Sequence, residues 1–322
     1  MSSLPRRRWT GAVAIGVGVV LAGCNSGAGT VEAQPSTSAA PSPLDSPTHS
    51  ADPSGEPEPA PSTVPSAAAG KTTAAIYYLV DTRNGIRLQR EFRQVPRTDA
   101  PVRAALEQMF REPALDRDYS SLWPRTTAVR GIARSGATAT IDLSRDALGG
   151  KGGAEATEMS VQQLVHTVTA ADRTITGIRI LVEGKEVTDL WGHESLSGRT
   201  LRRGSHIEVL AFVSIDNPNE GTEVGKTFTL SGTATVFEAN VQWRVTRGCP
   251  ADVTCVGDKP IYASGFVTAS EGAPGRGSWS VKVTVPEEVL ETAGYVEITA
   301  FEESAEDGAE THSDTKVVRV VR

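Results

Sequence analysis

The segment of residues 25–70 restricts most strongly what this chain can fold into. It contains no aromatic residue, no lysine and no arginine, and it holds nine of the 19 prolines, mixed with serine, alanine and threonine. A segment of this composition buries too little apolar surface to offset the entropy lost on ordering. We therefore expect a disordered, Pro/Ser/Ala-rich linker, with a glycosylated mucin-like stalk as the alternative. The fold is then confined to residues 71–322.

Residues 1–24 have the features of an export signal. Three arginines, Arg6–Arg8, precede an uncharged run of about 13 residues, which is shorter than the roughly 20 that a membrane-spanning helix needs. The run ends in Leu-Ala-Gly-Cys, whose last residue is Cys24. An ordinary cleaved signal peptide is one interpretation of this segment, and the export route, general or twin-arginine, stays open.

The tetrapeptide before and including Cys24 resembles the bacterial lipobox. This resemblance implies a lipoprotein whose Cys24 thiol carries a diacylglyceryl group and becomes the first residue of the mature chain. Two or three acyl chains of the palmitate type would make a stable membrane anchor, at about 0.8 kcal/mol per buried methylene. We therefore expect the protein on the extracytoplasmic face of the cell membrane.

Net charge divides the remaining chain into two parts. The whole chain carries −7, which argues against a nucleic-acid binder, because phosphate contacts require clustered excess cation. Residues 71–215 carry +3, whereas residues 216–322 carry −8. The change falls beside the turn-rich sequence Asp216-Asn217-Pro218. We therefore predict a domain at 71–215 and a second domain at 216–322.

The first domain is predicted to be α+β, with a mixed sheet and two helices. A helix with Pro101 in its first turn is expected after a Thr98 or Asp99 cap, and a second has its apolar stripe between Val161 and Val168. The segments with strand-type patterns are residues 76–80, 86–95, 137–143, 178–182 and 206–213. The order of strands and helices is typical of α+β layer packing.

The second domain is predicted to be an all-β, immunoglobulin-like sandwich. Apolar and polar residues alternate in about seven short segments separated by turn residues. These segments are residues 228–230, 233–237, 241–245, 261–267, 279–285, 296–300 and 315–320.

Five stretches resemble two known families. Trp123–Ser144, Val161–Ala170 and Ile178–Gly192 are similar to the GerMN domain of sporulation and germination proteins. Ser231–Val245 and Tyr295–Gly308 resemble the immunoglobulin-like domain of bacterial spore germination, which commonly follows GerMN. The resemblance implies an interaction module without enzymatic activity and a role in sporulation or germination.

Catalytic motifs are missing from the sequence. Ser195 and Ser197 lack the first glycine of a nucleophile elbow, and the Gly-Gly-Lys sequence at residues 149–151 lacks the spacing of a phosphate-binding loop. Asp142 and Asp189 could form a carboxylate pair for glycan hydrolysis, although neither lies in a recognisable motif. A peptidoglycan-active enzyme, or an accessory subunit of one, is therefore the alternative function.

Metal sites and cofactors are not expected. His166, His193 and His206 could converge on a metal, but His166 lies about 140° from the apolar stripe of its helix and is expected to face solvent. The acidic residues between Glu302 and Asp314 could bind calcium, but their spacing is not that of an EF-hand and is more typical of a solvated face.

Two tryptophans and two cysteines complete the candidate sites. Trp123 and Trp191 lie near turns and could stack on sugar rings, with core packing as the other interpretation. Cys249 and Cys255 can reach the Cα separation of a disulfide in an exported protein, and such a small loop contributes about 2 kcal/mol. Because Cys24 is consumed by lipid, no odd thiol remains.

These features together predict a lipid-anchored, non-catalytic protein of the cell envelope. Its partners would be the membrane, through Cys24, and cell-wall glycan or another envelope protein, through the two domains.

Overall fold

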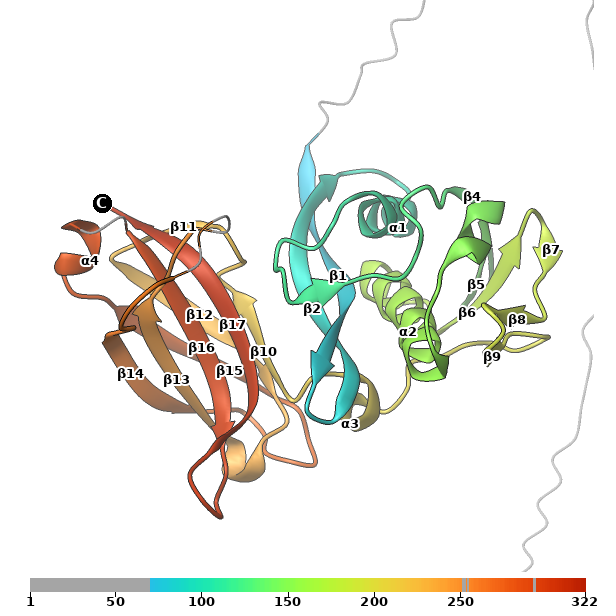
Figure 1. Ribbon diagram of the computed structural model, residues 1–322. Helices are drawn as coiled ribbons and strands as arrows, with labels where there is room; N and C mark the ends of the chain where they lie inside the picture. The colour runs from blue at the N-terminus through green and yellow to red at the C-terminus, as the bar shows by residue number, and fades with distance from the viewer. Residues whose placement is uncertain (1–69, 251–252, 254, 292–293) are drawn as a thin grey trace, which may run out of the picture. The chain divides into compact units, whose positions relative to one another are not determined.

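A computed structural model of the chain describes residues 70–322 except 251–252, 254 and 292–293 (Figure 1). Cys24, the signal segment and nearly all of the linker lie outside the described residues. Within the described part, no helix combines the length and the apolar character that crossing a membrane would require.

The first domain begins with a long hairpin. Strands β1 (Lys71–Thr82) and β2 (Gly85–Pro96) pair antiparallel, with Thr82 opposite Gly85. Gly85 has a φ of 91°, a conformation that glycine adopts without a steric penalty, so the turn closes here. Helix α1 (Pro101–Arg111) follows, and strand β3 (Tyr119–Ser120) joins β1 to give the order β2-β1-β3.

A second sheet completes this domain. Its strands β4 (Val129–Ser135), β5 (Thr138–Leu143), β6 (Gly177–Val182) and β7 (Lys185–Glu186) lie in sequence order. Strands β5 and β6 are parallel, and the connection between them contains the 3-10 helix η1 (Arg145–Gly149) and helix α2 (Ala154–Ala171). Strands β8 (Asp189–Leu190) and β9 (Glu194–Ser195) form a separate short ribbon.

Helix α2 is buried on nearly every side. Its Leu164 packs in the main core of this domain, while Gln163 donates to the Tyr77 carbonyl and Thr167 accepts from the Tyr77 N–H of β1. The prediction that His166 faces solvent is therefore wrong, since its side chain is only 2% exposed. An amphipathic helix has one solvent-exposed face. Helix α2 instead contacts α1, β1 and β6, so the face that carries His166 is covered.

The second domain is a sandwich of two sheets, which confirms the predicted fold class. One sheet has the order β10 (Val213–Asn217), β12 (Thr227–Ala234) and β15 (Gly277–Thr284). The other has the order β11 (Glu223–Gly225), β17 (Glu310–Val321), β16 (Tyr295–Glu303), β13 (Asn240–Arg247) and β14 (Ile261–Thr268). The single turns η2 (Phe237–Ala239) and α4 (Glu288–Glu291) connect strands.

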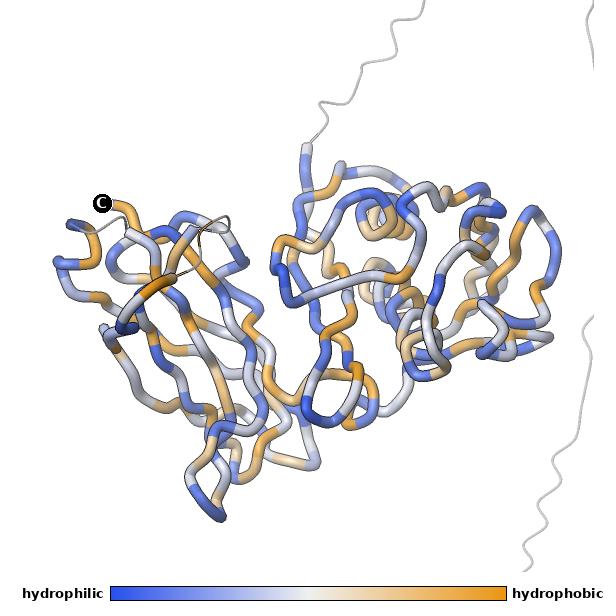
Figure 2. The backbone as a smooth tube through the Cα atoms, in the orientation of Figure 1, coloured by the Kyte–Doolittle hydropathy of each residue, from blue (hydrophilic) through white to orange (hydrophobic). Residues whose placement is uncertain are grey.

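Hydropathy follows this layered organisation. Figure 2 shows hydrophobic segments in the strands of both domains, whereas the turn between β16 and β17 is hydrophilic. Alternate residues of β15, such as Trp279 and Val283, point into the sandwich core with Ile298 of β16.

Two predicted strands differ from the structure. Residues 206–213 do not form a closing strand: helix α3 (His206–Val209) comes first, and β10 then pairs with β12 of the sandwich. The predicted strand at 233–237 is the end of β12 followed by the start of η2. Both segments are apolar and short, and apolar character alone does not distinguish a strand from a buried turn.

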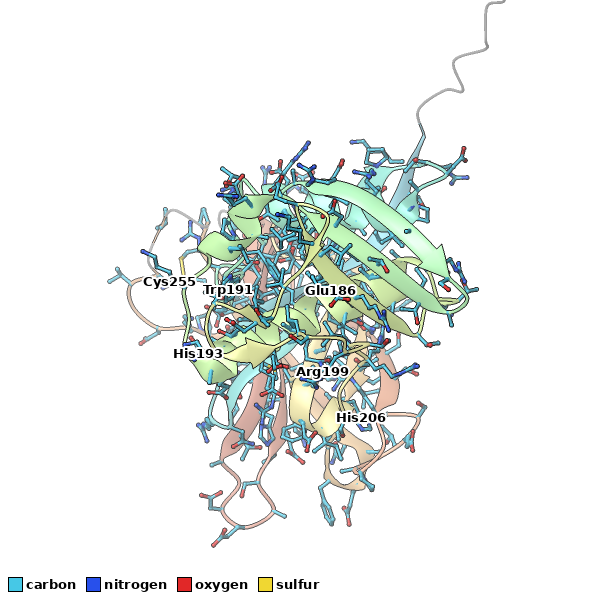
Figure 3. The ribbon with its side chains drawn as sticks, turned by 90° about the vertical axis from the view of Figure 1, so that its right-hand side faces the viewer. Glu186, Trp191, His193, Arg199, His206 and Cys255 are labelled. Carbon is cyan, nitrogen blue, oxygen red and sulfur yellow. A yellow bond between two sulfur atoms is a disulfide. The ribbon has the colours of Figure 1, made fainter. Side chains whose placement is uncertain are left out.

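Cys249 and Cys255 form a disulfide in the connection between β13 and β14. Their Cα atoms lie 5.6 Å apart. Figure 3 labels Cys255 on this connection, which belongs to the second domain.

Candidate functional site

The two tryptophans pack inside the first domain. Trp123 is 3% exposed, and its indole N–H donates to the Ser160 carbonyl of α2 at 3.0 Å. Trp191, labelled in Figure 3, donates to the Ala147 carbonyl at 2.9 Å and packs edge-on against Trp123. The core interpretation, rather than sugar stacking, therefore describes Trp123, and Trp191 is half-buried beside it.

The polar residues considered for catalysis or metal binding lie in different elements: Asp142 in β5, Asp189 in β8 and His206 in α3. Asp142 accepts a hydrogen bond from the Gly184 N–H, and Asp189 accepts one from the Gly192 N–H, each at 2.8 Å. His193 follows Trp191 in the turn between β8 and β9 (Figure 3). His206 begins α3 and places its Nε2 2.9 Å from the Pro274 carbonyl oxygen.

A groove of about 780 Å³ lies in the first domain. It lies between β1 and β2, the C-terminal end of α2 and the segment just before α3. Threonine hydroxyls and small alanines contribute much of its wall, from Thr72, Thr73, Ala74, Ala75, Ala170, Ala171 and Thr176. No local sequence pattern indicates this groove.

Four arginines line this groove, which we call the arginine groove: Arg90, Arg173, Arg202 and Arg203. Among the described residues of its lining there is no aspartate or glutamate. Its wall is therefore cationic, although the chain as a whole carries −7.

Arg203 and Arg90 are held in place by the fold. Arg203 donates to the Thr169 hydroxyl at 2.7 Å and to the His166 carbonyl at 3.2 Å, and it lies over the Tyr77 ring. Arg90 makes a two-pronged ion pair with Asp216, with N···O distances of 2.8 and 2.6 Å. These two guanidinium groups are thus fixed by internal contacts.

Arg202 and Arg173 are more available. Arg202 is exposed and donates to the carbonyl and hydroxyl oxygens of Thr176, both of which are neutral. Arg173 is exposed, and its side chain has no hydrogen bond or ion pair within the described part of the chain. Its neighbour Asp172 is paired with Arg134 at 3.0 Å. Three positive charges of the groove, those of Arg173, Arg202 and Arg203, therefore lack a carboxylate partner among the described residues.

His166 lies behind the groove and is kept neutral. Burial, followed by the nearby positive charges of Arg203 and Arg276, lowers its pKa to about 3. Its ring packs against Tyr77, with 5.0 Å between centroids, and neither ring nitrogen has a hydrogen-bond partner in the described structure. The imidazole therefore adds no charge to the groove near neutral pH.

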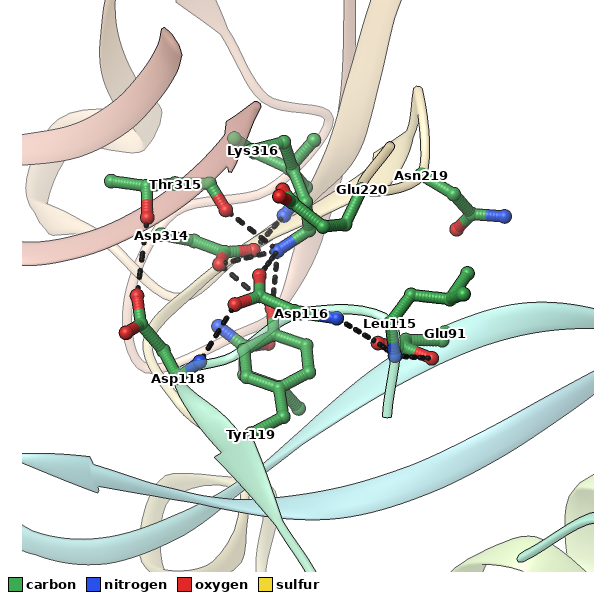
Figure 4. A network of polar contacts seen from close by, with 12 residues as sticks. Glu91, Leu115, Asp116, Asp118, Tyr119, Asn219, Glu220, Asp314, Thr315 and Lys316 are labelled. Carbon is green, nitrogen blue, oxygen red and sulfur yellow. Dashed lines mark hydrogen bonds and ion pairs between the residues drawn. The ribbon is translucent and has the colours of Figure 1, made fainter. Parts of the chain in front are cut away.

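A buried cluster of charges joins the first domain to the sandwich (Figure 4). Lys316 of β17 places its Nζ 2.7 Å from Asp116, 2.8 Å from Asp314 and 2.6 Å from the Tyr119 hydroxyl. Asp314 also accepts from Tyr119 at 2.7 Å and from the Ile215 N–H at 2.6 Å. Loop, strand and sandwich are thus connected through one ammonium group, and we call these residues the junction cluster.

The charges of the junction cluster depend on each other. Burial alone would lower the pKa of Lys316, but the carboxylates of Asp314 and Asp116 outweigh this and raise the pKa above its usual value. Burial, followed by the charge of Asp314, raises the pKa of Tyr119, so its phenol stays protonated and donates. The cluster therefore operates as a charged unit at neutral pH.

Glu91 anchors the loop that carries Asp116. It is 2% exposed, accepts hydrogen bonds from the backbone N–H groups of Leu115 and Asp116, and pairs with Arg93 at 2.8 Å. Figure 4 shows Glu91 on the side of the loop away from Lys316. The loop is thus held by two buried charges, its Leu115 and Asp116 backbone by Glu91 and the Asp116 side chain by Lys316.

Glu220 gives the junction a pH dependence. Burial and, to a smaller extent, the charge of Asp116 raise its pKa to about 7, outweighing the hydrogen bond from the Val317 N–H, which lowers it. Because the folded chain binds this proton more tightly than the unfolded chain, stability falls as pH rises from about 4.5 to about 7.

We expect Glu220→Gln to remove this loss. Between pH 5 and pH 8 the free energy of unfolding of the variant should rise by about 1–3 kcal/mol relative to that of the parent chain. This range allows for the partial exposure of Glu220, which reduces the effect of its pKa shift. Urea unfolding at both pH values measures the difference. Equal pH profiles for the two chains would contradict the assignment.

Comparison with known proteins agrees with this two-domain structure. Residues 75–188 match the family model described as sporulation and spore germination, and residues 212–309 match that of the immunoglobulin-like domain of bacterial spore germination. No curated protein matches the chain.

Two solved structures from Bacillus subtilis are similar to parts of the chain. The first GerMN domain of the sporulation protein GerM is 20% identical, with 41% of this chain and 98% of that one covered and a TM-score of 0.34. The tandem GerMN domains of GerM are 13% identical, with coverages of 70% and 66% and a TM-score of 0.35. The family matches confirm both resemblances: the chain carries a GerMN-type sporulation and spore germination domain followed by an immunoglobulin-like domain of bacterial spore germination.

Proposed function

We propose that this protein is a lipid-anchored binding module of the cell envelope, acting on the extracytoplasmic face of the membrane. Cys24 would carry the lipid, and the linker of residues 25–70 would hold the two domains away from the membrane. The partner would be cell-wall glycan or another envelope protein. A role in sporulation or germination is consistent with the descriptions of both matching families.

The observation that carries this proposal is the arginine groove. Recessed, charged surfaces with few competing internal partners are suited to binding. Arg173 and Arg202 offer unpaired charge, while Arg203 and Arg90 are preorganised beside them by hydrogen bonds to Thr169 and Asp216. Preorganised groups lose less entropy when a ligand arrives, which supports a binding function.

The experiment separates anchoring from binding. The full chain and its Cys24→Ala variant are labelled with palmitate in cells, and the purified variant is then mixed with isolated envelopes and with protein-free wall sacculi. We expect the parent chain alone to incorporate palmitate, and we expect the Cys24→Ala variant still to sediment with envelopes through its domains, releasing no soluble wall fragments.

Three results would oppose this proposal. Palmitate on the Cys24→Ala variant would contradict the anchor, and a variant that stays soluble with both envelopes and sacculi would contradict the binding module. Release of wall fragments that is lost in Asp142→Asn or Asp189→Asn would support the alternative function of a peptidoglycan-active enzyme.

A further inference from the structure

The arginine groove has a lining whose chemistry specifies one class of ligand. Its exposed arginines are Arg173, Arg202 and Arg203, and the threonine hydroxyls of β1 and of Thr176 add further donors. Guanidinium groups bind phosphate and carboxylate oxygens through paired hydrogen bonds. Hydroxyl groups are suited to polar, uncharged parts of the same ligand.

The aromatic residues of the groove are already occupied. The Tyr77 ring is buried and packs between His166 and Arg203, and Arg90 lies over the Phe92 ring at 5.3 Å. Protein partners are usually anchored by aromatic or aliphatic side chains in apolar pockets. The lining also includes Val95 and Ile175, but both are buried. The rest of the wall is mainly threonine, alanine and arginine, which favours a hydrophilic chain instead.

The size of the groove favours a polymer over a single ion. Its volume of about 780 Å³ is far larger than one phosphate or carboxylate requires, and its arginines come from three segments of the chain, β2, the end of α2 and the segment before α3. An anionic chain could therefore place successive charged groups against Arg173 and Arg202 while its uncharged units contact the threonines.

We propose that the arginine groove binds an anionic cell-wall glycan, a carbohydrate polymer whose repeating units carry phosphodiester or carboxylate groups. This inference rests on the proposed envelope-binding function and names the ligand of its groove. Arg173 and Arg202 contact the anionic groups directly. Arg203 is a positioning residue, since its guanidinium is held by Thr169 and the His166 carbonyl.

The test uses the detergent-purified full chain and four fluorescent probes measured by anisotropy. Oligo-glycerol-phosphate and oligogalacturonate represent the phosphodiester and carboxylate forms of the ligand, neutral dextran lacks charge, and oligoglutamate represents an acidic protein segment. We expect binding of at least one anionic glycan that weakens as salt is raised, because screening reduces the attraction between charges. Comparing the two anionic glycans identifies which oxyanion the groove prefers.

The double variant Arg173→Glu, Arg202→Glu should raise the dissociation constant for the anionic glycan about 100-fold. Each lost charge-assisted hydrogen bond is expected to weaken binding roughly tenfold. Arg145→Glu is the matched control, since Arg145 is an exposed arginine in η1 of the same domain and does not line the groove. It should change the affinity less than about threefold. Circular dichroism and a melting curve on each variant verify that both remain folded.

Several outcomes would overturn the inference. These are equal binding of dextran and the anionic glycans, binding of oligoglutamate alone, no binding of any probe, or unchanged affinity in the double variant. If the Cys24→Ala variant nevertheless sediments with envelopes, the proposed function stands and only the ligand assignment of the groove fails. A variant that fails to sediment would remove the proposed function itself.

Discussion

Replacing Lys316 with methionine is expected to lower the free energy of unfolding by about 3–5 kcal/mol at neutral pH. The methionine preserves most of the side-chain volume, so the loss comes from charge. The substitution removes the ammonium group that lies within 2.8 Å of Asp116, Asp314 and the Tyr119 hydroxyl. Both carboxylates would be left buried without a positive partner, which costs far more than the pair contributes when intact.

Lys259→Met is the matched control for this experiment. Lys259 makes an ion pair of similar length with Glu297, 2.9 Å, but the two side chains are 45% and 26% exposed. Exposed pairs contribute at most about 1 kcal/mol, so the control should remain close to the parent chain. Urea unfolding monitored by tryptophan fluorescence and by circular dichroism gives both values.

The loss in Lys316→Met should also depend on pH. Without the lysine, buried carboxylates are protonated more readily, and a neutral carboxyl group is less costly to bury. The difference between variant and parent should therefore shrink as pH falls from 7 to 4. A loss below about 1 kcal/mol at pH 7, equal to that of Lys259→Met, would show that the junction cluster does not hold the two domains together.

The sequence contains a pattern that indicates the junction cluster, although net charge alone does not reveal it. Asp314, Lys316, Val318 and Val320 occupy alternate positions of β17, and all four are buried. Alternation along a strand places them on one face, so two charged residues in register with core valines indicate a buried ion pair. Treating Asp314 as part of a solvated acidic run missed this register.

Local sequence patterns predicted the helices and strands that bury only one face. Helix α1 has Pro101 in its first turn as expected and buries Val102, Leu106 and Met109. Its N-cap residue is Ala100, so the predicted cap at Thr98 or Asp99 is wrong. The strands of the sandwich alternate as their residues do. Helix α2 was predicted too, but its exposure was not, because sequence periodicity does not reveal that two sheets enclose the helix.

The arginine groove could not be predicted from local patterns. Its arginines lie at positions 90, 173, 202 and 203, so the fold alone brings them together. The sequence carried one coarse sign of it, the net charge of +3 on residues 71–215 in an otherwise acidic chain. Which arginines lack partners is decided by tertiary contacts such as those of Asp172 with Arg134 and Asp216 with Arg90.

The Gly232→Ala substitution is expected to destabilise the sandwich by about 3 kcal/mol or more. Gly232 lies on the central strand β12, opposite Ile215 of β10 and Trp279 of β15. A methyl group at this position would overlap the Ser214 carbonyl oxygen and would lie 2.8 Å from the Trp279 ring. Because the carbonyl belongs to the backbone of a paired strand, it cannot move aside without disturbing the pairing of β10 with β12.

Gly225→Ala separates this clash from a general effect of losing a glycine. Gly225 lies in β11, and its closest potential contact for an added methyl is the Thr227 carbonyl oxygen at 3.6 Å, an ordinary separation. This control should be neutral or stabilising by up to about 1 kcal/mol, since alanine restricts the unfolded chain more than glycine does. Urea unfolding of both variants compares them directly.

If Gly232→Ala unfolds at the same urea concentration as Gly225→Ala, the close approach of β10 and β12 at this glycine does not constrain the sandwich. If only Gly232→Ala is destabilised, steric exclusion explains why β12 carries a glycine at the centre of its sheet, where the absence of a side chain would otherwise weaken a strand.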